Sequence, residues 1–146
     1  MSQVKFESKQ TRANAPVESV WGALSDLENL NRLRSLIPED KVKDLTIEQD
    51  VIRFKIDGLA KKVGVRVVDR EVNKTLKFAL EDVPVEAFFW IQTVGVSESD
   101  TRLKLTVKAD MPAMFRMMLE KKLQTGLDQA ADILAQLPYQ EWEKKQ

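Results

Sequence analysis

The sequence predicts an α+β domain in which a strongly curved antiparallel sheet of seven strands wraps around one long C-terminal helix. Three observations carry this prediction. Residues 111–137 form an almost unbroken helical pattern, the chain before them consists of short segments that alternate apolar and polar residues, and 146 residues suit one domain. A helix of that length in so short a chain needs a broad apolar surface to lie on, and the strands supply it.

The first part of the chain predicts one strand followed by two short helices. Residues 4–11 alternate apolar and charged side chains, as in a strand with one buried face. The short helices are predicted over residues 16–24 and 27–36. Pro16 fits the first turn of the first helix, and Asp26 ends that helix and caps the second. Helices of this size usually close the end of a curved sheet.

The next segment predicts a β-hairpin with an irregular strand. Ile47 faces Ile52 if residues 49–50 form a two-residue turn. The same register would put the charged Lys43 opposite the apolar Ile56, so the pairing must shift by one residue here. We therefore expect a β-bulge next to Lys43.

Two further strands follow this hairpin. A turn at residues 57–58 precedes a long strand over residues 61–72, in which the valines change parity after Val67 and so predict a second bulge. Residues 76–80 alternate regularly and predict the next strand.

The last two strands are predicted at residues 85–94 and 103–109, joined by a polar loop. The first of them is apolar on both faces. If Ser97 pairs with Asp100, its even-numbered residues, Trp90 among them, point inward. The odd-numbered residues, such as Phe89, would then form a small outer patch suited to self-association. A register shifted by one residue would exchange the two sets, so the sequence does not decide which face of this strand points inward.

The C-terminal helix has recognisable ends and one apolar stripe. Asp110 offers an N-terminal cap, Pro112 fits the first turn, and Pro138 follows the end. The stripe consists of Phe115, Leu119, Leu123, Leu127, Ala130, Leu134 and Leu137. The polar residues of the opposite side are Glu120, Lys121, Gln124, Asp128 and Asp132. Gly126 costs helix stability, so we expect it to allow either close contact with the sheet or room for a ligand. We place the domain at residues 1–138 and a charged tail at 139–146.

The composition excludes several classes of function. Lys plus Arg and Asp plus Glu number 23 each, so no net charge favours binding to nucleic acid. The chain has no cysteine and no histidine, which removes the usual thiolate nucleophile, general base and transition-metal ligands. We expect no metal site, no cofactor and no catalytic residues. No signal peptide or apolar run of membrane-spanning length is present, which predicts a cytoplasmic protein without stable membrane insertion.

The order of elements and one local motif resemble a known superfamily. The motif is the run Ala15-Pro-Val-Glu-Ser-Val-Trp-Gly-Ala-Leu-Ser-Asp26. Together they resemble the helix-grip or START-like fold of the SRPBCC group, which contains polyketide cyclases, dehydrases and lipid-transport proteins. The likeness covers about residues 3–137. It implies a cavity between sheet and helix that holds an apolar ligand, and it implies no particular activity, because the fold supports many.

The residues expected to line this cavity lie on the inward faces of the predicted strands and helix. They are Phe6, Ile52, Phe54, Val65, Phe78, Trp90, Gln92, Leu103, Leu105, Phe115, Leu119, Leu123, Gly126 and Leu127. Gln92 is the best candidate for a polar contact, ahead of Ser8 and Thr125. Arg34 is a weaker candidate for binding an anion. Methionines 111, 114, 117 and 118 either fill gaps in the core or form an adaptable cavity mouth with the loops at residues 57–61 and 81–85.

Three functions remain open from the sequence, and the first is favoured. The domain binds or carries a small apolar or amphipathic molecule without converting it. Alternatively it is a cyclase- or dehydrase-type enzyme, or a protein-interaction module like the related domains of co-chaperones that stimulate the Hsp90 ATPase. Glu86 and Asp69 could form a carboxylate pair for acid–base chemistry only if both bulges place them together.

Overall fold

The structure, a computed structural model, describes residues 2–29, 31, 43–48, 50–55, 61–83 and 85–139. The elements are β1 (Ser2–Glu7), β2 (Thr11–Ala13), α1 (Val17–Ser25), β3 (Lys43–Ile47), β4 (Val51–Lys55), β5 (Val63–Glu71), β6 (Thr75–Glu81), β7 (Ala87–Ser97), β8 (Asp100–Met111) and α2 (Ala113–Ala135).

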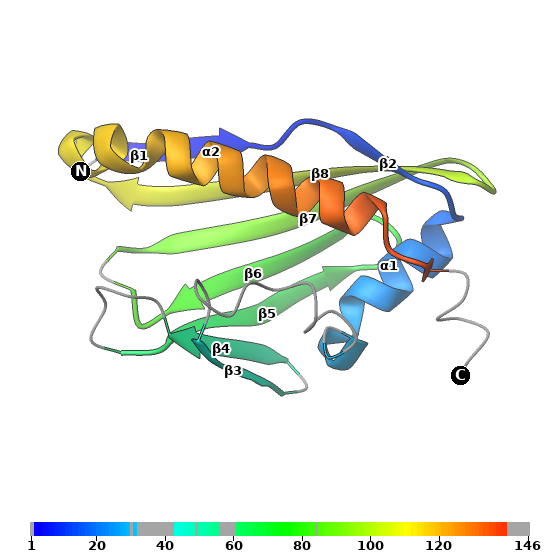
Figure 1. Cartoon of the computed structure of the whole chain (residues 1–146), viewed down its shortest axis with the longest axis horizontal. Helices are drawn as coiled ribbons and strands as arrows, with labels where there is room; N and C mark the ends of the chain where they lie inside the picture. Colours follow the sequence, from blue (N-terminus) through cyan, green and yellow to red (C-terminus); the bar gives the residue numbers. More distant parts are fainter. Residues whose placement is uncertain are drawn as a thin grey trace.

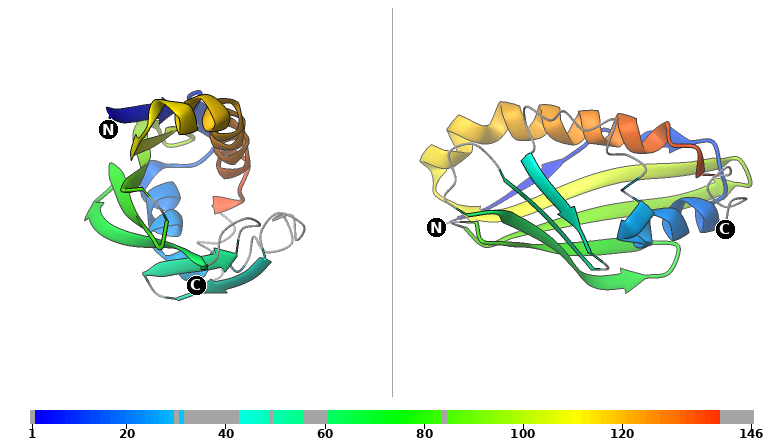
Figure 2. Two further views of the ribbon diagram at one scale, coloured as in Figure 1. Left: turned by 90° about the vertical axis from the view of Figure 1, so that its left-hand side faces the viewer. Right: turned by 60° about the horizontal axis from the view of Figure 1, so that its bottom comes forward.

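The strands form one antiparallel sheet. Their order is β1-β8-β7-β6-β5-β4-β3, and β2 also pairs with β8. The sheet curls around α2, and α1 lies at the end of the molecule opposite to the end where α2 begins (Figures 1 and 2). The chain therefore has the predicted α+β architecture, a curved antiparallel sheet that wraps around a long C-terminal helix.

The described residues form eight strands rather than seven because the first predicted strand is divided. The Ser8 N–H donates to the Leu105 carbonyl, whereas the Leu105 N–H donates to the Ser8 hydroxyl at 2.8 Å. The hydroxyl thus takes the place of a backbone acceptor, and the pairing with β8 shifts by one residue between Glu7–Thr106 and Thr11–Leu103. β1 covers the start of the predicted strand, and β2 begins at its last residue, Thr11, and continues to Ala13.

The first short helix is α1, and the second is described only at its start. Residues 27–29 form a 3₁₀ turn in which the Asn29 N–H donates to the Asp26 carbonyl at 3.0 Å. The predicted remainder of that helix, including Arg34, lies outside the described residues, as does the predicted turn at residues 57–58.

Both predicted bulges are confirmed. Ile47 pairs with Ile52, and the register of β3 against β4 shifts between Lys43 and Thr46. Asp44, inside that irregularity, has a φ of 53°. The register of β5 against β6 shifts between Val67 and Asp69. In each case the parity of the apolar residues in the sequence located the irregularity.

The inner face of β7 is the odd-numbered one. Ser97 does pair with Asp100, but the register shifts between Gly95 and Ser97, so that Ile91 pairs with Leu105 and Trp90 with Thr106. The prediction that Trp90 and Gln92 point inward is therefore wrong. Ile91 is buried in the core, and the alternative register, shifted by one residue, describes this strand.

The long helix is shorter at both ends than predicted. Its N-cap is Pro112, without a side-chain hydrogen bond, and Asp110 belongs to β8. The capping role predicted for Asp110 is wrong because the strand continues to Met111. Beyond the helix, Leu137 and Tyr139 are buried, at 8% and 2% exposure. Tyr139, which was predicted to lie in the tail, thus belongs to the core.

Three hydrogen bonds join α2 to β1, to β2 and to the residues between these two strands. The Gln124 amide donates to the Glu7 carbonyl at 2.7 Å, and the Lys9 N–H donates to Asp128 Oδ1 at 2.7 Å. The Thr11 hydroxyl donates to the Ala131 carbonyl at 3.1 Å. These contacts all lie in the second half of α2, whereas every residue from 113 to 122 is exposed.

Candidate ligand cavity

An apolar cavity of about 230 Å³ lies between the sheet and the second half of α2. The described residues that line it are Leu24, Leu27, Ile52, Val65, Phe78, Phe89, Ile91, Leu105, Ala130, Ile133 and Leu134.

Each wall of the cavity follows from a simple pattern. Strands β4, β5, β6 and β8 contribute one inward side chain each, and β7 contributes two alternate ones, because adjacent residues of a strand point to opposite faces. Residues 24 and 27 close the end near α1, and residues 130, 133 and 134 come from consecutive turns of α2. Ile133 is 41% exposed and lies at the rim, whereas Leu105 is fully buried at the base. Ile133 is thus the most exposed of the described lining residues.

The lining offers no described group for acid–base chemistry or hydrogen bonding. Every described lining side chain is aliphatic or phenyl. Polar side chains on the inner side of the sheet are already bonded to backbone. The Thr101 hydroxyl donates to the Ala15 carbonyl at 2.7 Å, and the Thr93 hydroxyl donates to the Lys74 carbonyl at 3.3 Å. A ligand portion inside this space would be held by dispersion and by exclusion from water.

Four of the predicted cavity residues line this space: Ile52, Val65, Phe78 and Leu105. Four others lie in or against the surrounding core: Phe6, Leu103, Leu123 and Leu127. Phe54 is partly buried on β4 and is not among the lining residues.

Trp90 and Gln92 lie on the outer face of the sheet. The Gln92 carbonyl oxygen accepts a hydrogen bond from the Thr106 hydroxyl at 2.9 Å. The Lys77 and Lys108 ammonium groups lie 5.4 and 5.6 Å from the Trp90 ring centroid, within the range of cation–π attraction. Neither residue can contact a ligand between sheet and helix, and the predicted polar contact through Gln92 is wrong.

The first half of α2 is exposed along its length. Phe115 and Leu119, predicted to line the cavity, are 49% and 37% exposed. Of the four methionines only Met111 is buried, and Met114, Met117 and Met118 are 66–80% exposed. The expectation that these methionines fill gaps in the core is wrong for three of the four, because helical periodicity identifies an apolar face without showing that anything covers it.

Gly126 makes no close contact with the sheet. It is exposed, and a methyl group built at its Cα would meet nothing within 4 Å. It borders a surface depression of about 620 Å³ whose described lining comes from α2, with Lys121, Lys122, Thr125 and Gln129. Gly126 was expected to allow either close contact with the sheet or room for a ligand, and close contact with the sheet is therefore excluded.

Several lining residues were not predicted to belong to the site. Phe89 and Ile91 were assigned to the wrong face, and a glycine within a strand pattern, Gly95, was the available sign of the bulge that reverses it. Leu24 ends the first predicted short helix and Leu27 begins the second, and neither was expected to line the cavity. Ile133 lies beside the predicted stripe of α2 rather than in it.

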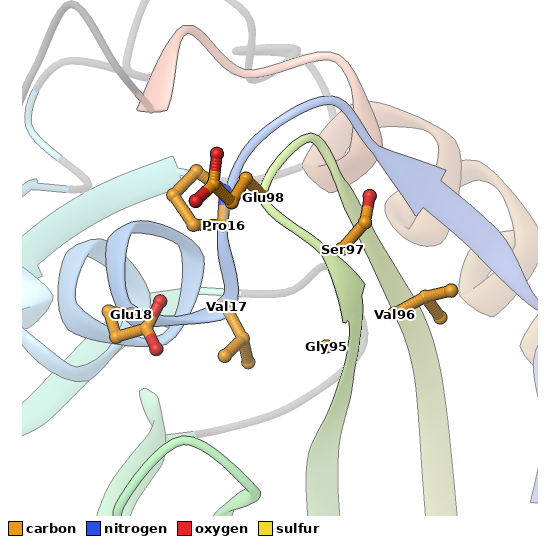
Figure 3. Close-up of a pocket in the computed structure, with 7 residues that line it drawn as sticks. All are labelled: Pro16, Val17, Glu18, Gly95, Val96, Ser97 and Glu98. Atoms are coloured by element: carbon orange, nitrogen blue, oxygen red, sulfur yellow. The ribbon is translucent and has the colours of Figure 1, made fainter.

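A second hollow of about 240 Å³ lies on the surface where α1 begins beside the end of β7. Its lining residues are Pro16, Val17, Glu18, Gly95, Val96, Ser97 and Glu98 (Figure 3). The Val17 side chain points toward Gly95, and a Cβ on that glycine would lie 2.9 Å from Val17 Cγ1. The two carboxylates of this hollow, Glu18 and Glu98, are not among the described residues that line the cavity beneath α2.

The charged groups with perturbed titration lie away from the cavity. Glu81 lies between two arginines, with Arg66 Nε at 2.9 Å and Arg53 Nη2 at 3.1 Å, and the Arg66 hydrogen bond lowers its pKa. Arg102 binds both carboxylate oxygens of Asp100 and lowers the pKa of that group. Glu86 and Asp69, considered as a carboxylate pair, are both exposed, and neither is among the lining residues.

The part of the chain that the structure describes contains no group of three or more Asp or Glu placed to hold a metal ion. Among the described residues, no helix combines the length and the apolar character needed to cross a bilayer.

No family model and no curated protein sequence matches the chain, but solved structures do. A norcoclaurine synthase point mutant from Thalictrum flavum, bound to a transition-state analogue, superposes with a TM-score of 0.73 at 18% identity over 98% of this chain and 99% of that one. The Zhui aromatase/cyclase from a Streptomyces species gives 0.53 at 19% identity, over 76% of this chain and 70% of its own. A START superfamily protein from Mycobacterium smegmatis gives 0.54 at 13% identity, over 83% and 88%. The chain has the START-like helix-grip fold.

Proposed function

We propose that this protein binds a small apolar or amphipathic molecule in the cavity beneath α2 and releases it unchanged. The observation that carries the proposal is a cavity whose described lining is entirely apolar, on a fold whose neighbours include a START superfamily protein. Concave, mainly apolar cavities with a preformed wall are the usual ligand sites of proteins.

The size of the cavity bounds the ligand. A volume of about 230 Å³ is below the ~300–1,000 Å³ of typical ligand pockets. The ligand is therefore either small or inserts only an apolar portion and leaves a polar end at the rim near Ile133. The absence of a polar group among the described lining residues favours a hydrocarbon portion over a hydrogen-bonding one, because an amide or hydroxyl would be buried there without a partner.

The enzyme alternative is less well supported. Two of the structural neighbours are named as a synthase and an aromatase/cyclase, and those activities are properties of those proteins. Proton transfer requires a titratable group within hydrogen-bond reach of the reacting atom. The described lining of this cavity holds none, so binding without conversion is the function that the residues favour.

Two adjacent alanines of α2 provide a matched test. Ala130 lines the cavity, whereas Ala131 is fully buried and its carbonyl accepts the Thr11 hydroxyl. Ala130→Leu should fill the cavity and abolish uptake of an apolar fluorescent probe with little loss of stability. Ala131→Leu should overpack the core, cost about 1–3 kcal/mol, and leave probe uptake intact below its melting temperature. Unchanged uptake by Ala130→Leu would place the ligand elsewhere.

A further inference from the structure

The first half of α2 exposes a group of large apolar side chains. Met114, Met117 and Met118 are 73%, 80% and 66% exposed, and Phe115 and Leu119 are 49% and 37% exposed. We call these five residues the α2 patch. They lie at the end of the molecule away from α1, where α2 begins (Figures 1 and 2). So many large apolar side chains within one helical segment mark an interaction surface.

Helix geometry divides the patch into two adjoining sides. Residues 114, 117 and 118 are three or four apart and share one side with Lys121. Phe115 and Leu119 are four apart and share the next side with Lys122. The opposite side of the segment carries Arg116 and Glu120. The lysines therefore lie within the apolar surface rather than across the helix from it.

The charge of this segment is positive. Arg116, Lys121 and Lys122 outnumber the single acid, Glu120. None of the three cations forms an ion pair with a residue that the structure describes. By contrast, Arg66 on β5 is paired with Glu81, and Lys9, between β1 and β2, is paired with Asp132. The α2 patch thus adjoins cations that no described carboxylate neutralises.

We propose that the α2 patch docks on the surface of an anionic lipid bilayer. Apolar side chains of an interfacial helix enter the boundary between headgroups and acyl chains, and adjoining lysines extend to the anionic headgroups. Methionine suits this environment because its flexible side chain adapts to a disordered apolar phase. The convex outer side of a helix also fits a soft, flat surface without a preformed groove.

Charge disfavours a second copy of this chain as the occupant. In a two-fold dimer the same surface meets itself, so the cations beside one α2 patch would face the cations beside the other. One acid per segment cannot balance three bases. An anionic surface is complementary to the patch, whereas the patch is not complementary to itself.

The position of the patch also relates it to the cavity, and this step rests on the proposed function. Phe115, Leu119, Gly126 and Ile133 fall on one side of α2 by their spacing. Gly126 interposes no side chain between the patch and the exposed cavity rim at Ile133. A bilayer bound at the α2 patch would therefore lie at one end of an exposed side of α2, and the cavity lies at the other end of that side.

Vesicle cosedimentation of the full chain tests this proposal. Vesicles of phosphatidylcholine mixed with phosphatidylglycerol should bind the protein, pure phosphatidylcholine should bind it weakly, and high salt should reduce binding. Met117→Ser/Met118→Ser and Lys121→Glu/Lys122→Glu should each lower the partition coefficient by about tenfold or more. Val94→Ser/Val96→Ser, at two valines that are 61% and 59% exposed on β7, is the matched control and should not change it.

The outcomes separate this proposal from the proposed function. Probe uptake without vesicles depends on the cavity alone, so Met117→Ser/Met118→Ser should retain it and Ala130→Leu should lose it. No binding to anionic vesicles by a protein that melts normally would overturn the docking proposal. So would light scattering that showed a dimer abolished by Met117→Ser/Met118→Ser.

Discussion

The backbone N–H of Lys9 donates to Asp128 Oδ1 over 2.7 Å and so joins the link between β1 and β2 to the middle of α2. The two residues are 119 positions apart in the sequence. With Gln124 and Thr11, this bond fixes the second half of the helix over the cavity. Among the described residues, no hydrogen bond of this kind reaches the first half of α2, and the described cavity wall comes from the second half.

Removing that acceptor should loosen the helix. Asp128→Ala leaves the Lys9 N–H without its partner and should lower the free energy of unfolding by about 1–2 kcal/mol, whereas Asp128→Asn, which keeps an acceptor, should lower it less. Urea denaturation measures both. Asp132→Ala is the control, since its ion pair with the Lys9 ammonium is about half exposed and should contribute little. Equal losses for all three variants would contradict this role of Asp128.

Tyr139 should mark the true end of the domain. Its ring is 2% exposed, its hydroxyl donates to the Leu134 carbonyl, and burial raises its pKa. A chain that ends at residue 139 should keep the stability of the full chain, and Tyr139→Ala should lose about 3–5 kcal/mol, by analogy with other buried aromatic residues. Tyr139→Phe should cost only about 0.5–1.5 kcal/mol. Thermal melts of the three proteins would refute this if Tyr139→Ala were neutral.

Two glycines should respond to alanine in opposite directions. A Cβ at Gly95 would lie 2.9 and 3.0 Å from Cγ1 and Cβ of Val17, so Gly95→Ala should cost about 1–3 kcal/mol. Adding Val17→Ala should recover part of that loss. Gly126→Ala meets open space in a helix interior and should stabilise the protein by up to ~1 kcal/mol. The same sign for both substitutions in urea denaturation would contradict these contacts.

Acid should remove a stabilising contribution of Asp100. Its pKa is lowered by the hydrogen bonds from Arg102 and by the nearby Arg12, so its carboxylate is more easily kept ionised in the folded chain than in the unfolded chain. Its contribution is complete above the ordinary pKa of 3.8 and is lost as the pH falls through the lower folded value. Asp100→Asn should therefore lower the unfolding midpoint at neutral pH and flatten its decline in acid. A variant whose acid dependence matched that of the parent chain would show that other carboxylates dominate.

Residue patterns predicted most of the fold because a strand with one buried face alternates apolar and polar side chains. This alternation shows which residues point inward. Ile47 opposite Ile52 and the bulge after Val67 followed directly from that alternation. In β7 the consecutive residues Phe88, Phe89, Trp90 and Ile91 are apolar on both faces, so parity could not select the inner one. A single bulge at Gly95 decided it.

The candidate site was harder to predict because local residue patterns do not show which apolar surfaces are covered in the folded chain. Periodicity shows that Phe115 and Leu119 share a side with the rest of the α2 stripe, but it does not show where the sheet stops covering that side. Tyr139 was missed because the domain was predicted to end at Pro138, whereas burial continues beyond it. Contacts that depend on the curvature of the whole sheet, such as Ile133 at the rim, have no local signal.

The central claim is that the cavity beneath α2 holds an apolar molecule that is released unchanged. Native mass spectrometry of gently purified protein, alongside Ala130→Leu, tests it most directly. We predict a noncovalent mass adduct on the parent chain, absent from Ala130→Leu, and recovery of the same molecule after it is extracted and incubated again with the protein. An adduct of equal occupancy on Ala130→Leu, or conversion of the extracted molecule to a product, would contradict the account.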